Sequence, residues 1–157
     1  MKDDMLSDNA HVLKLERQLC FSIYTFSRKI AKLYRPYLDG LHITYPQYLV
    51  VLVLGEYGTC TVTELGEKLF LDSGTLTPLL KRLQEAGFVS RMRSEEDERK
   101  VMVTLTEEGY SLWQRLQDIH NDLAGQIDVP LDEYTRTLEE FQQLVKRMGR
   151  IWGEKEL

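Results

Sequence analysis

Cysteine is scarce in this sequence, and neither its cysteines nor its histidines form a metal or disulfide pattern. The 157 residues contain two cysteines, Cys20 and Cys60, and three histidines, His11, His42 and His120. None of them shows the spacing of a zinc site, and two cysteines without CxxC spacing do not make a disulfide framework. We therefore expect neither a metal nor another cofactor.

Long hydrophobic runs and secretion signals are also missing. The longest apolar run, residues 48–54, is far shorter than the about 20 residues that span a bilayer. The first ten residues, MKDDMLSDNA, are acidic where a signal peptide needs a basic region and an apolar run. The motifs GxSxG, GxxxxGKS/T and GxGxxG do not occur. These absences predict a cytoplasmic protein that is neither a hydrolase nor a nucleotide-binding enzyme.

Positive charge is in short supply for a nucleic-acid binder. The net charge is −5, but acidic side chains concentrate in residues 106–157, which hold 6 basic and 11 acidic ones. Residues 71–93 hold 4 basic side chains against 2 acidic ones. This local balance permits DNA binding without demonstrating it.

The spacing of apolar residues predicts long helices towards both ends of the chain. Between residues 12 and 37 apolar side chains recur every three to four positions, which predicts an amphipathic helix ending near residues 36–40. A second helix is expected after Thr44, with Pro46 in its first turn. Another helix follows Thr106, and a last one covers residues 131–152.

The centre of the chain predicts a helix-turn-helix followed by a strand pair. Its first helix is short and is capped by Thr61 or Thr63. Residues 88–93 and 101–105 alternate as strands around the polar loop 94–100. Together these elements have the pattern of a winged helix-turn-helix, a module that places one helix in a DNA groove.

The second helix of this motif contains a proline that leaves two interpretations open. Its candidate caps are Asp72 and Ser73. Pro78 is either a first-turn proline capped by Thr77, or it lies in the second turn opposite Gly74. For Asp72 we favour the capping role over a contact with DNA.

The predicted fold class is mainly α with a small β-wing, in one domain covering residues 1–157. The winged helix-turn-helix occupies about residues 45–105, and long N- and C-terminal helices occupy about 10–40 and 106–157. The apolar stripes of the terminal helices are too long for the central module to cover, so we interpret them as the interface of a homodimer. Such a dimer presents two reading helices and two wings to a pseudo-palindromic site.

Short polar and basic side chains lie where this module meets DNA. Hydroxyl side chains at the start of the reading helix can contact base edges or phosphates, aided by the positive helix end. Basic side chains further along suit phosphates, and an arginine at the wing tip can enter a narrow minor groove. Ordinary helix caps and solvated charges would look the same in sequence. The candidate DNA-binding residues are Ser73, Thr75, Thr77, Lys81, Arg82 and Arg99.

Two stretches resemble a known family of regulators. The block FLDSGTLTPLLKRLQEAGFVSRMRSEEDERKVMVTLTEEG (residues 70–109) is similar to MarR-type transcriptional regulators. The stretch LERQLCFSIYTFSRKIAKLYRPYLDGLHITYPQYLVVLVL (residues 15–54) resembles the organic hydroperoxide resistance regulator branch of that family. The resemblance implies a DNA-binding repressor, and it implies that Asp97 folds back to brace Arg99 at the wing.

Cys20 is the proposed redox switch, although its default interpretation is a small buried apolar side chain. A sensor cysteine reacts as the thiolate, and hydrogen bonds from tyrosine hydroxyls favour that form. The resemblance nominates Tyr34 and Tyr45, with Tyr24 nearby. Tyr34 is 14 residues beyond Cys20, about 21 Å along one helix at ~1.5 Å per residue. If these two side chains meet, Tyr34 must come from the other subunit.

The expected signal is an organic hydroperoxide. Its organic tail would pack against apolar residues such as Phe21. Oxidation of Cys20 to sulfenic acid adds a polar oxygen, and a further bond to a low-molecular-weight thiol adds bulk. Either change would release DNA and allow expression of a peroxide-detoxifying gene. Branch members with a resolving cysteine carry it towards the C-terminal helices, and no cysteine follows Cys60. We therefore expect one-cysteine chemistry and interpret Cys60 as incidental, with pairing to Cys20 left open.

Three other functions remain as alternatives. A MarR-type repressor controlled by a small aromatic ligand would leave Cys20 dispensable. A thiol peroxidase would also use a reactive cysteine, but it would need neither the wing nor the basic side chains of the reading helix. A helical protein-interaction module would show no salt-dependent binding to DNA.

Overall fold

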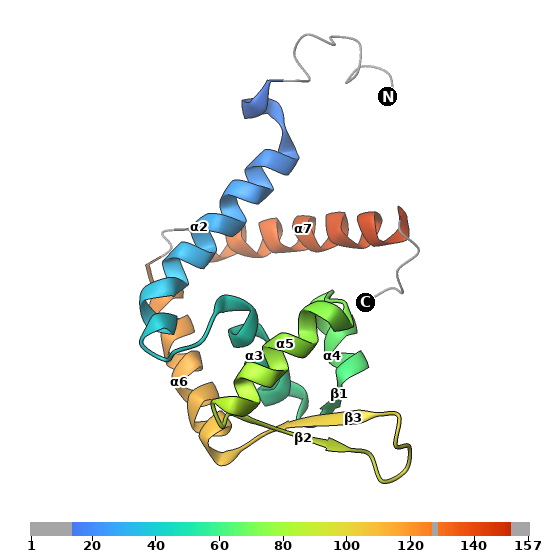
Figure 1. Ribbon diagram of the computed structural model, residues 1–157. Coiled ribbons are helices and arrows are strands. Elements are labelled where there is room, and N and C mark those ends of the chain that lie inside the picture. The colour runs from blue at the N-terminus through green and yellow to red at the C-terminus, as the bar shows by residue number, and fades with distance from the viewer. Residues whose placement is uncertain (1–13, 127–128, 152–157) are drawn as a thin grey trace. The chain divides into compact units, whose positions relative to one another are not determined.

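The computed structural model describes residues 14–126 and 129–151, and it is mainly helical with one small sheet (Figure 1). The chain divides into two compact units between Tyr48 and Leu49. The predicted fold class is confirmed. Along the chain the elements are η1 (Leu15–Arg17), α2 (Leu19–Asp39), α3 (Tyr45–Tyr57), β1 (Cys60–Thr61), α4 (Val62–Leu69), α5 (Ser73–Glu85), β2 (Val89–Arg93), β3 (Val101–Leu105), α6 (Glu107–Ala124) and α7 (Leu131–Ile151).

The first long helix begins later than its apolar stripe predicts. A 3₁₀ turn, η1, ends at Arg17, and Gln18 is extended with φ −93° and ψ 114°, so α2 starts only at Leu19. The expected stretch before residue 14 lies outside the described residues. The predicted end is confirmed, because α2 stops at Asp39 with Pro36 in its last turn.

The start of α3 is fixed by a local hydrogen-bond exchange. The Thr44 backbone N–H donates to Oε1 of Gln47 at 2.8 Å, and the Thr44 hydroxyl donates to the same oxygen at 3.1 Å. This arrangement lets Gln47 be buried with its amide oxygen satisfied. The predicted helix after Thr44, with Pro46 in its first turn, is confirmed.

The helix-turn-helix consists of α4 and α5. Thr61 caps α4 in a full capping box with Glu64. Of the two predicted caps, Thr61 and Thr63, the first is therefore correct. The turn that follows is tight: Phe70 takes a left-handed conformation with φ 53°, and a side chain at Gly66 would lie 2.7 Å from the Leu71 carbonyl oxygen. The direction in which α5 leaves α4 is thus set by backbone sterics.

Pro78 lies inside α5, in its second turn. It has no N–H to donate to the Gly74 carbonyl four residues earlier, and Gly74 has no side chain to crowd the proline ring. The second of the two interpretations is therefore correct. On the opposite side of α5, Leu76, Leu80 and Leu83 are fully buried and anchor the helix.

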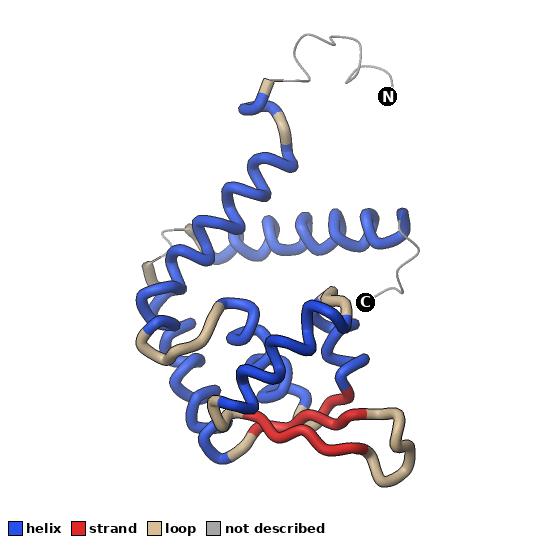
Figure 2. The backbone as a smooth tube through the Cα atoms, viewed as in Figure 1, coloured by secondary structure: helices blue, strands red, loops and turns tan. Residues whose placement is uncertain are grey.

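The wing is part of a three-stranded antiparallel sheet with the order β1–β3–β2 (Figure 2). The two predicted wing strands are present as β2 and β3, and in their pairing Val89 lies opposite Leu105 and Arg93 opposite Val101. Cys60 pairs with Val103, which adds the two-residue strand β1 that the sequence pattern did not reveal. Within the described residues, no helix is long and apolar enough to span a lipid bilayer.

Thr106 joins the wing to α6 through three hydrogen bonds. Its backbone N–H donates to the Phe88 carbonyl at 3.1 Å and its hydroxyl to the Gly87 carbonyl at 2.6 Å, while the Gly109 N–H donates to the hydroxyl oxygen at 3.0 Å. A Cβ at Gly109 would collide with the Phe88 carbonyl oxygen. Close packing of two backbones therefore requires glycine here.

Gly109→Ala is expected to destabilise the protein by about 3 kcal/mol, because neither backbone at this contact can move freely. For a chain of this size that loss lowers the melting temperature by roughly 6–12 °C in a thermal unfolding experiment. Gly125→Ala is the matched control, since a Cβ there lies 3.5 Å from the Asp122 carbonyl oxygen, an ordinary contact. Equal melting temperatures for the two variants would contradict this account.

Candidate DNA interface and cysteine site

The N-terminus of α5 presents hydroxyl groups to solvent. Asp72 caps the helix, with its carboxylate accepting from the Thr75 N–H at 2.9 Å and the Thr75 hydroxyl at 2.8 Å. These two hydrogen bonds lower the pKa of Asp72. Thr77 donates its hydroxyl to the Ser73 carbonyl at 2.7 Å. Ser73, Thr75 and Thr77 are exposed, and each hydroxyl oxygen keeps acceptor capacity for a DNA partner.

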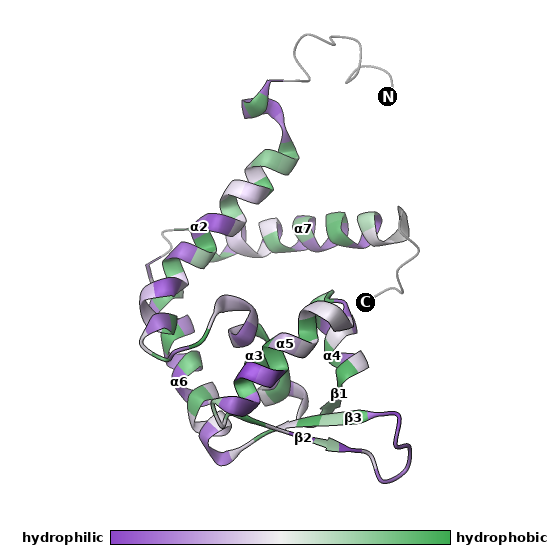
Figure 3. Cartoon of the chain, viewed as in Figure 1, coloured by the Kyte–Doolittle hydropathy of each residue, from purple (hydrophilic) through white to green (hydrophobic). Residues whose placement is uncertain are grey.

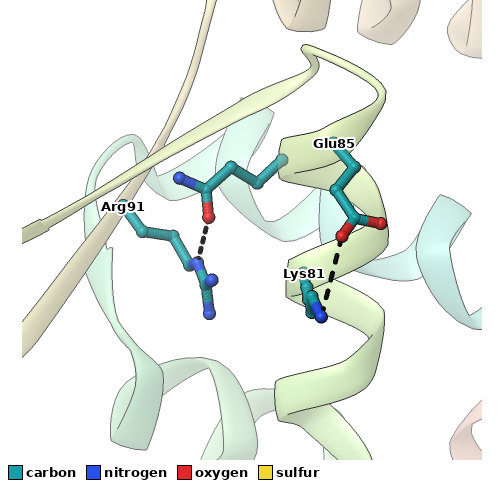
Figure 4. Close-up of polar contacts among 4 residues, drawn as sticks. Lys81, Glu85 and Arg91 are labelled. Atoms are coloured by element: carbon teal, nitrogen blue, oxygen red, sulfur yellow. Dashed lines mark hydrogen bonds and ion pairs between the residues drawn. The ribbon is translucent and has the colours of Figure 1, made fainter.

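Basic side chains occupy the second half of α5. Lys81 forms an ion pair with Glu85 at 3.8 Å, but its side chain is 68% exposed and the pair is of the weak surface kind (Figure 4). Arg82 is also exposed. Arg91 on β2 donates from Nε to Oε1 of Gln84 at 2.7 Å, so α5 and the wing are connected through their side chains.

The tip of the wing is a closed, charged turn that is hydrophilic throughout (Figure 3). The Ser94 N–H donates to the Lys100 carbonyl at 2.9 Å, and the Lys100 N–H donates to the Asp97 carbonyl at 2.8 Å. Oδ1 of Asp97 accepts from the Arg99 backbone N–H at 3.1 Å. Asp97 therefore holds the backbone of Arg99, while the Arg99 side chain is exposed.

The unit that ends at Tyr48 contains a cluster of three tyrosines. The ring centroids of Tyr34 and Tyr45 are 5.2 Å apart, and Tyr48 lies 5.2 Å from Tyr34 and 5.4 Å from Tyr45. Two of these residues were predicted from the sequence. Tyr48 was not, because it begins an apolar run and has the pattern of an ordinary core residue.

The two tyrosines on α3 keep their phenolic protons. Burial, and then the proximity of Tyr34, raise the pKa of Tyr45. Burial also raises the pKa of Tyr48, as does its side-chain hydrogen bond with Tyr34. Both phenols therefore remain neutral O–H donors at physiological pH.

Cys20 lies in the first turn of α2 and is exposed in the single chain, so its own chain does not bury it as an apolar core side chain. Tyr34 is on the same unbroken stretch of helix, 14 residues further on, and the about 21 Å between them rules out contact within one chain. Tyr24, one turn beyond Cys20, accepts a hydrogen bond from Nη1 of Arg28 at 3.1 Å. Of the predicted sensor residues, the structure thus brings together only Tyr34 and Tyr45.

A groove of about 760 Å³ lies along α2 within this same unit. Aromatic and apolar side chains form part of its wall, among them Phe21, Tyr24, Leu38, Ile43 and Tyr45. Its lining includes Phe21, the neighbour of Cys20 in sequence, and Tyr45 of the tyrosine cluster. The groove is large enough for a small organic molecule.

Cys60 has the opposite surroundings. It is 3% exposed in β1, where its thiol lies 3.7 Å from the Gly58 carbonyl oxygen. Burial raises the pKa of this thiol, and Glu64 raises it further. A buried, protonated thiol is a poor nucleophile, which agrees with an incidental role for Cys60.

Comparisons with known proteins agree on the class of this chain. The family model described as transcriptional regulator SarA/Rot matches residues 32–116. The organic hydroperoxide resistance transcriptional regulator of Bacillus subtilis (strain 168) is 54% identical over 113 residues, which cover 72% of this chain and 77% of that protein. The regulator SarZ of Staphylococcus saprophyticus is 40% identical, with coverage of 85% and 91%.

Solved structures of AbfR of Staphylococcus epidermidis share both the fold and the sequence. One is 38% identical with a TM-score of 0.76, and the match covers 90% of this chain and 98% of that chain. AbfR has been solved in a reduced form bound to DNA, in an overoxidized form bound to DNA, and with a disulfide formed. This chain therefore belongs to the MarR family of winged helix-turn-helix transcriptional regulators, in the branch of the organic hydroperoxide resistance regulators.

Proposed function

We propose that this protein is a homodimeric repressor that releases its operator after an organic hydroperoxide oxidises Cys20. The observation that carries the proposal is its 54% identity to an organic hydroperoxide resistance regulator, together with an exposed cysteine on α2. A regulator of this kind acts on the chromosome, so we place it in the cytoplasm.

The proposed homodimer accounts for apolar side chains that the single chain leaves uncovered. On α7 they recur every three or four residues: Leu131 is 79% exposed, Tyr134 49%, Leu138 43%, Phe141 39% and Val145 45%. A row of this kind on one helix face is unfavourable in water and calls for a partner. In a two-fold dimer the same face of a second copy covers it.

The same dimer completes the cysteine site. Because one helix cannot bring Cys20 to Tyr34, the α2 helices of two subunits must cross antiparallel for these side chains to meet. Cys20 of one subunit then lies beside Tyr34 and Tyr45 of the other, with Tyr24 nearby. The phenolic O–H groups donate to the thiolate and favour it over the thiol.

The DNA contacts are assigned to α5 and to the wing. Ser73, Thr75 and Thr77 face base edges or phosphates at the positive end of α5, and Lys81 and Arg82 face phosphates. Exposed Arg99, with its backbone held by Asp97, enters the minor groove. The two copies of α5 occupy successive major grooves of a pseudo-palindromic operator, about 34–36 Å apart.

The chemical step proceeds in two stages. The Cys20 thiolate attacks the outer oxygen of the hydroperoxide, the O–O bond breaks, and the products are a sulfenate and an alcohol. A low-molecular-weight thiol then attacks the sulfenic acid sulfur, which forms a mixed disulfide and releases water. Since overoxidized AbfR is bound to DNA, we assign release to the bulk of the mixed disulfide rather than to added oxygen.

A binding titration tests this proposal. The reduced protein should bind duplex DNA from the region upstream of its own gene, with an affinity that falls as salt rises. Cumene hydroperoxide together with a small thiol should abolish binding, and a reductant should restore it. The repressor assignment is wrong if the reduced protein binds no such duplex, and the redox assignment is wrong if peroxide and thiol leave binding unchanged.

Arg99→Ala should weaken operator binding by about 100-fold, since a lost minor-groove arginine costs about 1.4 kcal/mol at each of the two wings. Fluorescence anisotropy measures the affinity, and sedimentation velocity should show an unchanged dimer. Arg115→Ala on α6 removes an exposed charge away from the interface and should bind as the wild type does. If both variants lose similar affinity, the effect of Arg99→Ala comes from the change in net charge and not from a minor-groove contact.

A further inference from the structure

Tyr48 is a buried phenol that the proposed function does not use. It lies in the first turn of α3 and is 2% exposed, so its hydroxyl group is shielded from solvent and needs a partner within the protein. That partner is Tyr34 on α2: the two ring centroids are 5.2 Å apart, and the side chains share a hydrogen bond. The buried phenol is therefore joined to the residue that, in the proposed dimer, binds the thiolate.

The start of α3 determines where this phenol lies. The Thr44 N–H donates to Gln47, and the Tyr48 N–H donates to the Thr44 carbonyl at 2.9 Å, so the first turn of the helix is well defined. Tyr45 and Tyr48 are three residues apart and share one face of this turn. Both rings lie 5.2 Å from the ring of Tyr34. Tyr45 is half-buried, whereas Tyr48 lies in the core behind Tyr34.

The protons of the two hydroxyl groups can be accounted for. A tyrosine hydroxyl has one proton to donate, and its oxygen can also accept. If Tyr34 donates its proton to the thiolate of Cys20 of the partner subunit, the hydrogen bond with Tyr48 requires Tyr48 as its donor. Burial, followed by its contacts with Tyr34 and Tyr45, raises the pKa of Tyr48, so this donor keeps its proton. A hydroxyl that accepts one hydrogen bond donates a stronger one.

We propose that Tyr48 is a positioning residue of the cysteine site, which donates a hydrogen bond to the Tyr34 oxygen and thereby directs the Tyr34 O–H to the Cys20 thiolate of the partner subunit. The inference rests on the proposed function, because it requires the dimer in which Cys20 meets Tyr34. Tyr48 does not touch the sulfur and acts on it only through Tyr34. Two phenols in series thus stabilise the thiolate, and the second of them belongs to the core.

The test measures the pKa of the Cys20 thiol in the reduced, full-length protein, from the pH dependence of its alkylation by iodoacetamide. Peptide mass spectrometry separates Cys20 from Cys60. Tyr34→Phe should raise this pKa by about one pH unit or more, because a hydrogen bond to the thiolate is lost. Tyr48→Phe keeps the ring and should raise the pKa by about half a pH unit. Tyr57→Phe removes an exposed phenol at the other end of α3 and should leave it unchanged.

The double variant Tyr34→Phe/Tyr48→Phe distinguishes positioning from a general structural effect. It should have the same Cys20 pKa as Tyr34→Phe alone, because Tyr48 acts through Tyr34. Replacement of Tyr48 by 3-fluorotyrosine keeps the ring and makes the phenol a stronger donor, so it should lower the Cys20 pKa even if Tyr48→Phe does not fold.

Two results would overturn the inference. One is an unchanged Cys20 pKa with either replacement at position 48, in protein whose thermal unfolding shows that it is folded. The other is a further rise in the double variant equal to the rise in Tyr48→Phe. If Tyr34→Phe itself leaves the pKa unchanged, the dimeric cysteine site of the proposed function fails instead.

Discussion

Cys20→Ser is expected to bind the operator as tightly as wild type and to remain bound when an organic hydroperoxide and a small thiol are added. Serine keeps the size of the side chain and its hydrogen bonding, but its hydroxyl is not oxidised by peroxide. Under the same treatment the wild-type affinity should fall by about 100-fold, the scale of a coupling free energy near 3 kcal/mol. Anisotropy measures binding, and intact-mass spectrometry reports the adduct.

Cys60→Ala is the matched control, because it removes the other thiol of the chain. The Cys60 thiol of the wild type is buried and protonated. Removing it should therefore leave the release of DNA unchanged. If Cys20→Ser also releases the operator on treatment, the cysteine switch is wrong. Release of the operator by aromatic ligands, with no response to peroxide in wild type, would favour the alternative of a ligand-controlled MarR-type repressor.

Local chemistry explains which elements were predictable from sequence. The caps Thr61 and Asp72 each bond to a residue three positions on, so all the partners are visible in a short window. β1 has only two residues and exists because Cys60 pairs with Val103, more than 40 positions away. No local pattern encodes such a pairing.

Apolar periodicity also misled in two places. It extended α2 upstream of Gln18, because periodicity reports an apolar face and not the backbone dihedrals that end a helix. It also led us to interpret Tyr48 as an ordinary core side chain, so the contacts of Tyr48 with Tyr34 and Tyr45 were not predicted. The residues of the cysteine site could be predicted only from the resemblance of the sequence to a known family. The length of one helix then indicated that Tyr34 must come from the other subunit.

Phe141→Glu is expected to dissociate the dimer and with it to abolish tight operator binding. The side chain of Phe141 lies in the exposed apolar row of α7, and a carboxylate buried in a symmetric interface would face another copy of itself without a partner. A monomer engages one half-site only, so the operator affinity should fall by about 100-fold or more. Sedimentation velocity measures the dimer, and anisotropy measures binding.

Gln143→Glu introduces the same charge about 200° away around the helix axis, at about 100° per residue. Gln143 is exposed on the polar side of α7, so this variant should remain a dimer and bind DNA. Circular dichroism should show the same helix content for both, since neither side chain is buried in the single chain. If the Phe141→Glu variant is still a dimer, the interface does not lie on this face of α7. Contacts of α2 alone would then have to hold the two α2 helices in the crossing that brings Cys20 to Tyr34.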